Sequence, residues 1–288
     1  HLAASDTSAR DAGADLSSDL TMAFSDDIDG GVRPFHNAWD IGADEYGTGA
    51  VTEIYRSVGP ESTSALTSGG TLTISGSVAT FGGAMPDNVG VGDAIEYDYN
   101  DSGSVNKLCF ITGRVDSTRY TVASLTGSAP AETSTVDQDW SAYRAYTSLH
   151  DAEEGIENTG CSLFGGSVAD LPAAGGGYDL VSADTRWNIA CYADAVDTEE
   201  VEINGWTTNE EKHIKIFTPD TAAQVGASQR HGGKWSRSEG YMLYTHDTGS
   251  RDAISISEPY VYIQGLQIRG TSSCIYISGG SISAGDIR

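Results

Sequence analysis

The stretch DYNDSGSVN (98–106) places oxygen-bearing side chains at alternating positions, as the first half of a calcium-binding loop does. Asp98, Asn100 and Ser102 could each supply an oxygen ligand to Ca²⁺, and Gly103 permits the sharp turn that such a loop needs. The bidentate glutamate that would complete the loop is missing further along. The stretch therefore predicts either a weak or structural Ca²⁺ site or an ordinary acidic hairpin turn.

Three aspartates, Asp26, Asp27 and Asp29, lie close together in SDDIDGG (25–31). Carboxylates at this density either share a cation or repel one another in a solvated turn. This stretch predicts a second Ca²⁺ site or a polar turn, and Ca²⁺ is the cofactor that we expect.

A basic cluster in SQRHGGKWSR (228–237) combines positive charge with an aromatic ring. Arg230 and Lys234 could neutralise the carboxylate of a uronic acid, and Trp235 could stack on a sugar ring. Alternatively, the stretch is a loop that turns at two glycines and carries no ligand. Tyrosines that could add a sugar-binding face, but that we expect to pack between strands, are Tyr241, Tyr244, Tyr260 and Tyr262.

Motifs of other enzyme classes are absent from the sequence, which has no G-x-S-x-G, H-E-x-x-H, P-loop or dinucleotide-binding fingerprint. We therefore do not expect an enzyme. If the chain instead acts on glycans, we expect a secreted carbohydrate-active protein, either a polysaccharide lyase or hydrolase or a glycan-binding adhesin module.

The charge of the chain limits its partners. Sixteen basic and 41 acidic residues among 288 give a formal charge of −25. This opposes binding to nucleic acid or to an anionic membrane surface, and it favours solubility and divalent cations. No apolar run approaches the roughly 18 residues of a membrane span. The four widely spaced cysteines predict buried free thiols or an extracellular disulfide.

Many short strands are expected, because glycine, serine and threonine are abundant and punctuate apolar stretches. In 48–145, alternating apolar and polar residues predict an antiparallel, β-sandwich-like module. Its expected strands are 71–81, 89–98, 107–115 and 119–127.

A short helix is expected over 146–158, with Leu149, Ala152 and Ile156 on one face. Ser148 and Asp151 resemble a weak capping box at its start. A helix this short must pack on another element.

From Trp187 onwards, short strands with polar corners follow one another. Val261, Ile263, Leu266 and Ile268 are expected to point inward, with a bend at Gly265. Stacked coils need this pattern of apolar residues inside and small or polar residues at corners.

The stretches WNIACYADAVDTEEVEINGWTT, KHIKIFTP, SQRHGGKW and EPYVYIQGLQIRG resemble the first coils of the right-handed parallel β-helix family of large extracellular and surface proteins. AYTSLHDAEEGIE resembles the amphipathic helix that plugs the N-terminal end of such a β-helix. The first 47 residues, which include WDIGADEY, are similar to the closing coils of the same family. The chain thus resembles the ending of one β-helix followed by the opening of another.

The resemblance implies an all-β fold in three parts: an N-terminal arm (1–47), the β-sandwich-like module (48–145), and a capping helix with a right-handed parallel β-helix (146–288). It further implies an extracellular or cell-surface filament subunit, in which the arm of one copy complements the open β-helix end of the next. The expected interface residues are Trp39, Ile41, Ala43 and Tyr46 in the arm, and Ile275, Ile277, Ile282 and Ile287 in the last strands. Two alternatives are stacking within one larger polypeptide and folding of the arm onto its own chain.

Overall fold

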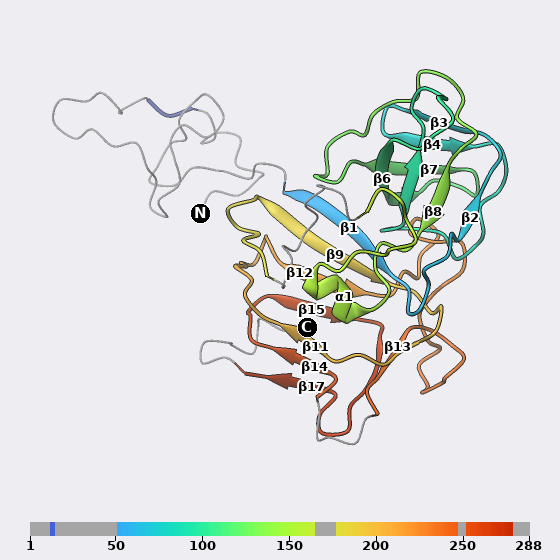
Figure 1. Ribbon diagram of the computed structural model, residues 1–288. Coiled ribbons are helices and arrows are strands. Elements are labelled where there is room, and N and C mark those ends of the chain that lie inside the picture. The colour runs from blue at the N-terminus through green and yellow to red at the C-terminus, as the bar shows by residue number, and fades with distance from the viewer. Residues whose placement is uncertain (1–11, 15–50, 165–176, 247–251, 279–288) are drawn as a thin grey trace. The chain divides into compact units, whose positions relative to one another are not determined.

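The computed structural model describes residues 12–14, 51–164, 177–246 and 252–278 (Figure 1). The chain separates into two compact units, His1–Val51 and Thr52–Arg288. The described residues are almost entirely strands and loops with one short helix, which confirms the all-β prediction. All of these elements lie in the second unit.

Three of the sheets are parallel. The first contains β1 (Thr52–Val58), β9 (Thr185–Cys191), β12 (Ile214–Phe217) and β15 (Val261–Gln264). The second contains β10 (Val196–Asp197), β13 (Met242–Tyr244) and β16 (Gln267–Arg269). The third contains β11 (Val201–Ile203), β14 (Ile254–Ile256) and β17 (Ile275–Ile277).

The chain passes through these sheets in the same order three times, as β9-β10-β11, β12-β13-β14 and β15-β16-β17. We call each passage a round. Successive rounds are in register, so that Trp187, Ile214 and Val261 lie on neighbouring strands and are all buried. Gly265, at φ +83°, makes the corner between β15 and β16, where a Cβ atom would lie 2.3 Å from Thr218 Oγ1. The bend that the sequence predicts at this glycine is therefore confirmed.

The fourth sheet is antiparallel and has the strand order β2-β8-β5-β6-β7-β4-β3. Its strands are β2 (Thr67–Ser68), β3 (Leu72–Ser75), β4 (Val78–Phe81), β5 (Ala94–Tyr97), β6 (Lys107–Arg114), β7 (Arg119–Ala123) and β8 (Ser141–Tyr143). A separate apolar core lies within it, where the rings of Phe81 and Trp140 are 4.6 Å apart. These seven strands form one sheet.

The stretch 71–81, which the alternation of its residues predicts as one strand, is a hairpin. Gly76 and Ser77 both have positive φ, +54° and +60°, and they turn β3 back onto β4. Two-residue hairpin loops require this left-handed backbone. Because the alternation of apolar and polar residues continues through the turn, the sequence pattern does not reveal the turn.

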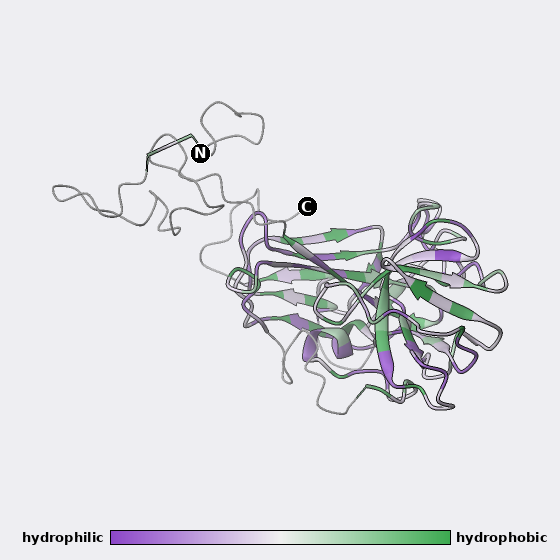
Figure 2. Ribbon diagram, turned by 90° about the horizontal axis from the view of Figure 1, so that it is seen from above, coloured by the Kyte–Doolittle hydropathy of each residue, from purple (hydrophilic) through white to green (hydrophobic). Residues whose placement is uncertain are grey.

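Strand β1 comes from the region that the sequence assigns to the antiparallel module, yet it pairs in parallel with β9 along its whole length. The pairing runs from Thr52 opposite Thr185 to Val58 opposite Cys191. The first parallel sheet therefore contains one more strand than the other two. Figure 2 shows hydrophobic residues recurring along the strands of the parallel and antiparallel sheets.

Helix α1 (Leu149–Glu154) is shorter than the expected 146–158. It begins after Ser148, the predicted cap, whose side chain accepts a hydrogen bond from Asp151 N at 2.9 Å. Leu149 and Ala152 are buried as expected. The prediction for Ile156 is wrong, since this side chain is 51% exposed. The helix ends before it, at a left-handed Gly155, and Glu153 takes a buried position instead.

Candidate functional site

The two ends of the stacked rounds differ. At the first round, α1 packs against β11, and Leu149 N donates a hydrogen bond to the carboxylate of Asp197 in β10 at 2.8 Å. At the third round, no described strand pairs with the outer side of β15, β16 or β17. We call these three strands the open edge.

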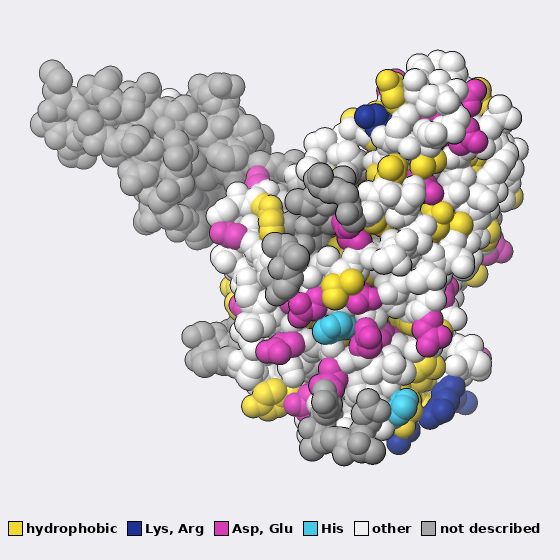
Figure 3. Space-filling view, in the orientation of Figure 1, with side chains coloured by type: hydrophobic (Ala, Val, Ile, Leu, Met, Phe, Trp, Pro, Cys, Tyr) yellow, Lys and Arg dark blue, Asp and Glu magenta, His cyan; other side chains and the backbone are white. Residues whose placement is uncertain are grey.

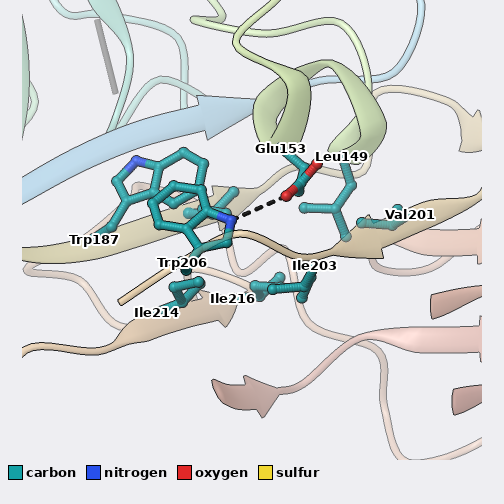
Figure 4. Close-up of a pocket in the computed structure, with 9 residues that line it drawn as sticks. Leu149, Glu153, Trp187, Val201, Ile203, Trp206, Ile214 and Ile216 are labelled. Carbon is teal, nitrogen blue, oxygen red and sulfur yellow. Dashed lines mark hydrogen bonds between the residues drawn. The ribbon is translucent and has the colours of Figure 1, made fainter. Parts of the chain in front are cut away.

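The interior beneath α1 is filled by side chains (Figure 4). The rings of Trp187 and Trp206 stack with centroids 4.6 Å apart, and Trp206 Nε1 donates to Glu153 Oε1 at 2.9 Å. The cavity that these residues and their apolar neighbours line has a volume of about 10 Å³, which is too small for any ligand. This end is therefore closed by packing, and we call the helix α1 that covers it the plug.

The open edge exposes apolar side chains. Ile275 and Ile277 in β17 are 37% and 44% exposed, although they lie in register with Ile254 and Ile256, which are completely buried. The two inner isoleucines are covered by the next round, whereas no described round covers the outer two. Two of the predicted interface residues are thus at an uncovered strand edge. The others, Trp39, Ile41, Ala43, Tyr46, Ile282 and Ile287, lie outside the described residues.

An acidic groove with a volume of about 580 Å³ lies beside α1. Its acidic lining comprises Glu154, Glu199, Glu200, Glu202 and Asp252, and His150 lies among them. Figure 3 shows acidic side chains surrounding a histidine over α1 and β11. The carbonyl oxygen of Glu200 lies 3.0 Å from His150 Nδ1. Sequence patterns did not single out this groove, because the helix α1, the 199–202 stretch and Asp252 before β14 come together only in the fold.

The predicted calcium loop is organised around Asp98, whose side chain is buried. Its carboxylate accepts hydrogen bonds from Ser102 Oγ at 2.8 Å, Gly103 N at 3.0 Å and Asn106 Nδ2 at 2.7 Å. Burial would raise the pKa of Asp98, but these hydrogen bonds outweigh it and hold the pKa well below its usual range. The carboxylate oxygens of Asp98, which the sequence assigned to Ca²⁺, therefore accept hydrogen bonds from groups of the protein itself.

The nearest group of carboxylates that could share an ion, within the part of the chain that the structure describes, is Asp101, Asp137 and Asp139. Their ligand oxygens all lie within 4.8 Å of one another. Ca²⁺ binding by Asp98, Asn100 and Ser102 stays a prediction, as does binding by Asp26, Asp27 and Asp29, which lie outside the described residues.

The predicted glycan residues are in two different environments. Arg230 forms an ion pair with Asp220, and its Nε lies 3.5 Å from Thr218 Oγ1. Lys234 and Trp235 are exposed on the loop that follows, and Trp235 is 47% exposed. Of the three predicted glycan-binding residues, Arg230 is thus held in an ion pair, whereas Lys234 and Trp235 are exposed.

Sequence reasoning missed Arg269 as a neighbour of this loop. Arg269 in β16 lies beside Tyr244 in β13, and its Cζ is 4.9 Å from the centre of the tyrosine ring. Arg237 approaches the same ring at 5.1 Å. The position of Arg269 follows from the register of β13 with β16, in which Tyr244 lies opposite Arg269. No local sequence pattern reveals this register. Tyr241 packs as expected: it is buried and donates to Asp197 at 2.6 Å.

All four cysteines, Cys109, Cys161, Cys191 and Cys274, are free thiols, and the first three are buried.

Comparison with known proteins found no match to the chain among protein-family models, curated proteins or solved structures. Among the described helices, none has the length and apolarity to cross a membrane.

Proposed function

We propose that the chain is an extracellular structural protein, in which the three rounds belong to a right-handed parallel β-helix that assembles head-to-tail through the open edge. The observation that supports this is the difference between the two ends. The first round is plugged by α1, whereas the third presents Ile275 and Ile277 beside strands that lack an outer partner among the described residues.

Main-chain hydrogen bonds would supply much of the affinity at such an edge. Every strand of the open edge has N–H and C=O groups directed toward the position of a further strand. Ile275 and Ile277 would enter the interior of the added round, as Ile254 and Ile256 do one round earlier. Covering these two side chains contributes on the order of 1 kcal/mol each.

The occupant that we propose is the segment 1–47 of a neighbouring copy, which carries Trp39, Ile41, Ala43 and Tyr46. A contact between two different surfaces of the same chain does not close on itself, so repetition gives a filament. This is a form of donor-strand exchange. The same edge would be filled within one molecule if the rounds belonged to a longer polypeptide.

The test is electron microscopy and analytical ultracentrifugation of the purified chain. We expect filaments, and we expect Ile275→Asp/Ile277→Asp to leave monomers because charges cannot enter the apolar interior. The matched control is Val115→Asp/Val136→Asp, which changes two side chains of similar exposure, 51% and 49%, and should still give filaments.

A deletion variant tests the role of the arm independently of the open edge. Deletion of residues 1–47 should also leave monomers, and an excess of the separate 1–47 peptide should shorten filaments of the full chain. Filaments from the deleted chain would refute the arm exchange, and monomers of the full chain at every concentration would refute the filament.

Two further measurements test the other expectations. Loss of filaments with a calcium chelator would show that assembly requires Ca²⁺, whereas turnover of polygalacturonate would favour the carbohydrate-active alternative.

A further inference from the structure

A second surface combines the loop before β13 with the end of β16, one strand of the open edge. Lys234 and Arg237 are exposed on the loop before β13, and Arg269 is exposed at the end of β16. Together with Trp235 and Tyr244 we call these residues the basic patch. Figure 3 shows Lys and Arg side chains gathered beneath β13, with a histidine beside them. Such a gathering is unusual in a chain with only 16 basic residues against 41 acidic ones.

Gln267 fixes the loop that carries half of the basic patch. Its buried side chain accepts from Ser236 N at 2.7 Å and donates to Ser236 O at 2.9 Å and to Glu239 O at 2.6 Å. Gln267 and Arg269 are two residues apart in β16, so their side chains lie on the same face of the sheet. The loop is therefore held against the face from which Arg269 projects.

Two guanidinium groups share one aromatic ring in the basic patch. Arg237 and Arg269 lie 5.1 Å and 4.9 Å from the centre of the Tyr244 ring. Attraction to the ring offsets part of their mutual repulsion. Trp235 is two residues from Arg237, so their Cα atoms are at most about 7 Å apart.

Among the described residues, these cations lack the carboxylate partners that several arginines have. Arg230 pairs with Asp220, Arg119 with Asp116, and Arg144 with Asp93. No described carboxylate forms an ion pair with Lys234, Arg237 or Arg269, although Glu239 lies in the same loop. These three side chains are therefore not held in an ion pair by any described carboxylate, which leaves their donors free to contact an external anion.

We propose that the basic patch binds an anionic polysaccharide, with carboxylate or sulfate groups at Lys234, Arg237 and Arg269 and a sugar ring against Trp235. Arginine forks match such anions, and the exposed indole offers a flat apolar face. Nucleic acid fits less well: the net charge of −25 repels any polyanion, and it repels duplex DNA most, because DNA carries about one charge per 1.7 Å. In a filament the patch would recur on every copy, so that one polymer could contact several copies.

The experiment measures binding of the full chain to polygalacturonate, to chondroitin sulfate and to neutral dextran by isothermal titration calorimetry at low and physiological salt. We expect one or both anionic polymers to bind and dextran not to bind, with salt weakening the interaction. Comparison of the two anionic polymers distinguishes a carboxylate from a sulfate ligand.

Two variants assign the binding to the patch. Arg237→Ala/Arg269→Ala and Trp235→Ala should each raise the Kd by roughly tenfold or more. The control is Lys107→Ala, which removes an exposed cation 5.3 Å from the ring of Tyr99 on the antiparallel sheet and should leave the Kd unchanged. Unchanged melting temperatures would show that all three variants fold.

Four results would overturn the proposal. One is no binding to either anionic polymer at low salt. Another is equal binding by the wild-type chain and both patch variants. The third is DNA binding as tight as polysaccharide binding. The fourth is that the patch variants change only self-association in the ultracentrifuge.

Discussion

Arg144 and Asp93 form an ion pair in which both side chains are completely buried, with Arg144 Nη1 2.8 Å from Asp93 Oδ1. The same guanidinium contacts Asp194 through Nε at 2.7 Å and Nη2 at 3.0 Å, and it lies 3.6 Å from the centre of the Tyr192 ring. Arg144 and Asp93 flank strands of the antiparallel sheet, whereas Asp194 follows β9 of a parallel sheet. This network therefore ties the two kinds of sheet together.

Replacement of Arg144 by alanine should destabilise the protein by about 3–5 kcal/mol, because it leaves the buried carboxylate of Asp93 without its cation. Burial already raises the pKa of Asp93, and Arg144 opposes that shift. The measurement is urea denaturation followed by tryptophan fluorescence. Arg119→Ala is the control, since Arg119 and Asp116 are both exposed and such a pair contributes about 1 kcal/mol or less. Equal losses in the two variants would contradict the assignment.

Glu153→Gln should change the pH dependence of stability. Burial raises the pKa of Glu153, although hydrogen bonds from Trp206 and Asn204 oppose the shift. A raised folded-state pKa means that the contribution of this carboxyl is complete below its unfolded pKa of about 4.3 and is lost as the pH rises through the folded value. Glutamine keeps an oxygen acceptor for Trp206 and does not titrate. The melting temperature of the variant relative to wild type should therefore increase from pH 4 to pH 8, and a constant difference would contradict this.

Local sequence patterns predicted many of the elements because strand alternation and helix caps are local. The expected strands at 107–115 and 119–127 correspond to β6 and β7, and Ser148 caps α1 as its position indicates. Features that depend on distant partners were missed. The pairing of Thr52 with Thr185 joins residues more than a hundred positions apart, which neither segment encodes by itself.

Buried cations were also beyond sequence reasoning. Arg56 and Arg144 are 1% and 0% exposed, although arginine is usually exposed. The guanidinium of Arg56 lies 3.5 Å from the centre of the Phe110 ring and donates to Leu125 O at 2.9 Å. Their burial depends on rings, carbonyls and carboxylates that only the fold brings together. For the same reason, Arg269 was not among the predicted glycan-binding residues: its neighbour Tyr244 is distant in sequence.

Gly92→Ala should strongly destabilise the protein. Gly92 has φ +89°, and a Cβ atom would lie 2.4 Å from the carbonyl carbon of Arg56, a backbone atom that cannot move aside. We expect a loss of more than about 1 kcal/mol in thermal denaturation experiments. Gly83→Ala is the matched control, because its φ is not in the left-handed region and its Cβ would meet no atom within 4 Å. A control as unstable as the variant would show that the close approach at Gly92 is not the cause.

Ser148→Ala should loosen the plug over the first round. The substitution removes the acceptor for Asp151 N and should destabilise α1 by about 1 kcal/mol. Because Leu149 and Glu153 of this helix line the closed interior with Trp187 and Trp206, the loss should extend to their neighbours. Hydrogen exchange measured by mass spectrometry should show faster exchange in α1 and β11, with little change in the antiparallel sheet. Ser148→Thr keeps the hydroxyl acceptor and should exchange as wild type does. Uniform acceleration across all sheets would instead show that α1 opens only when the whole unit unfolds.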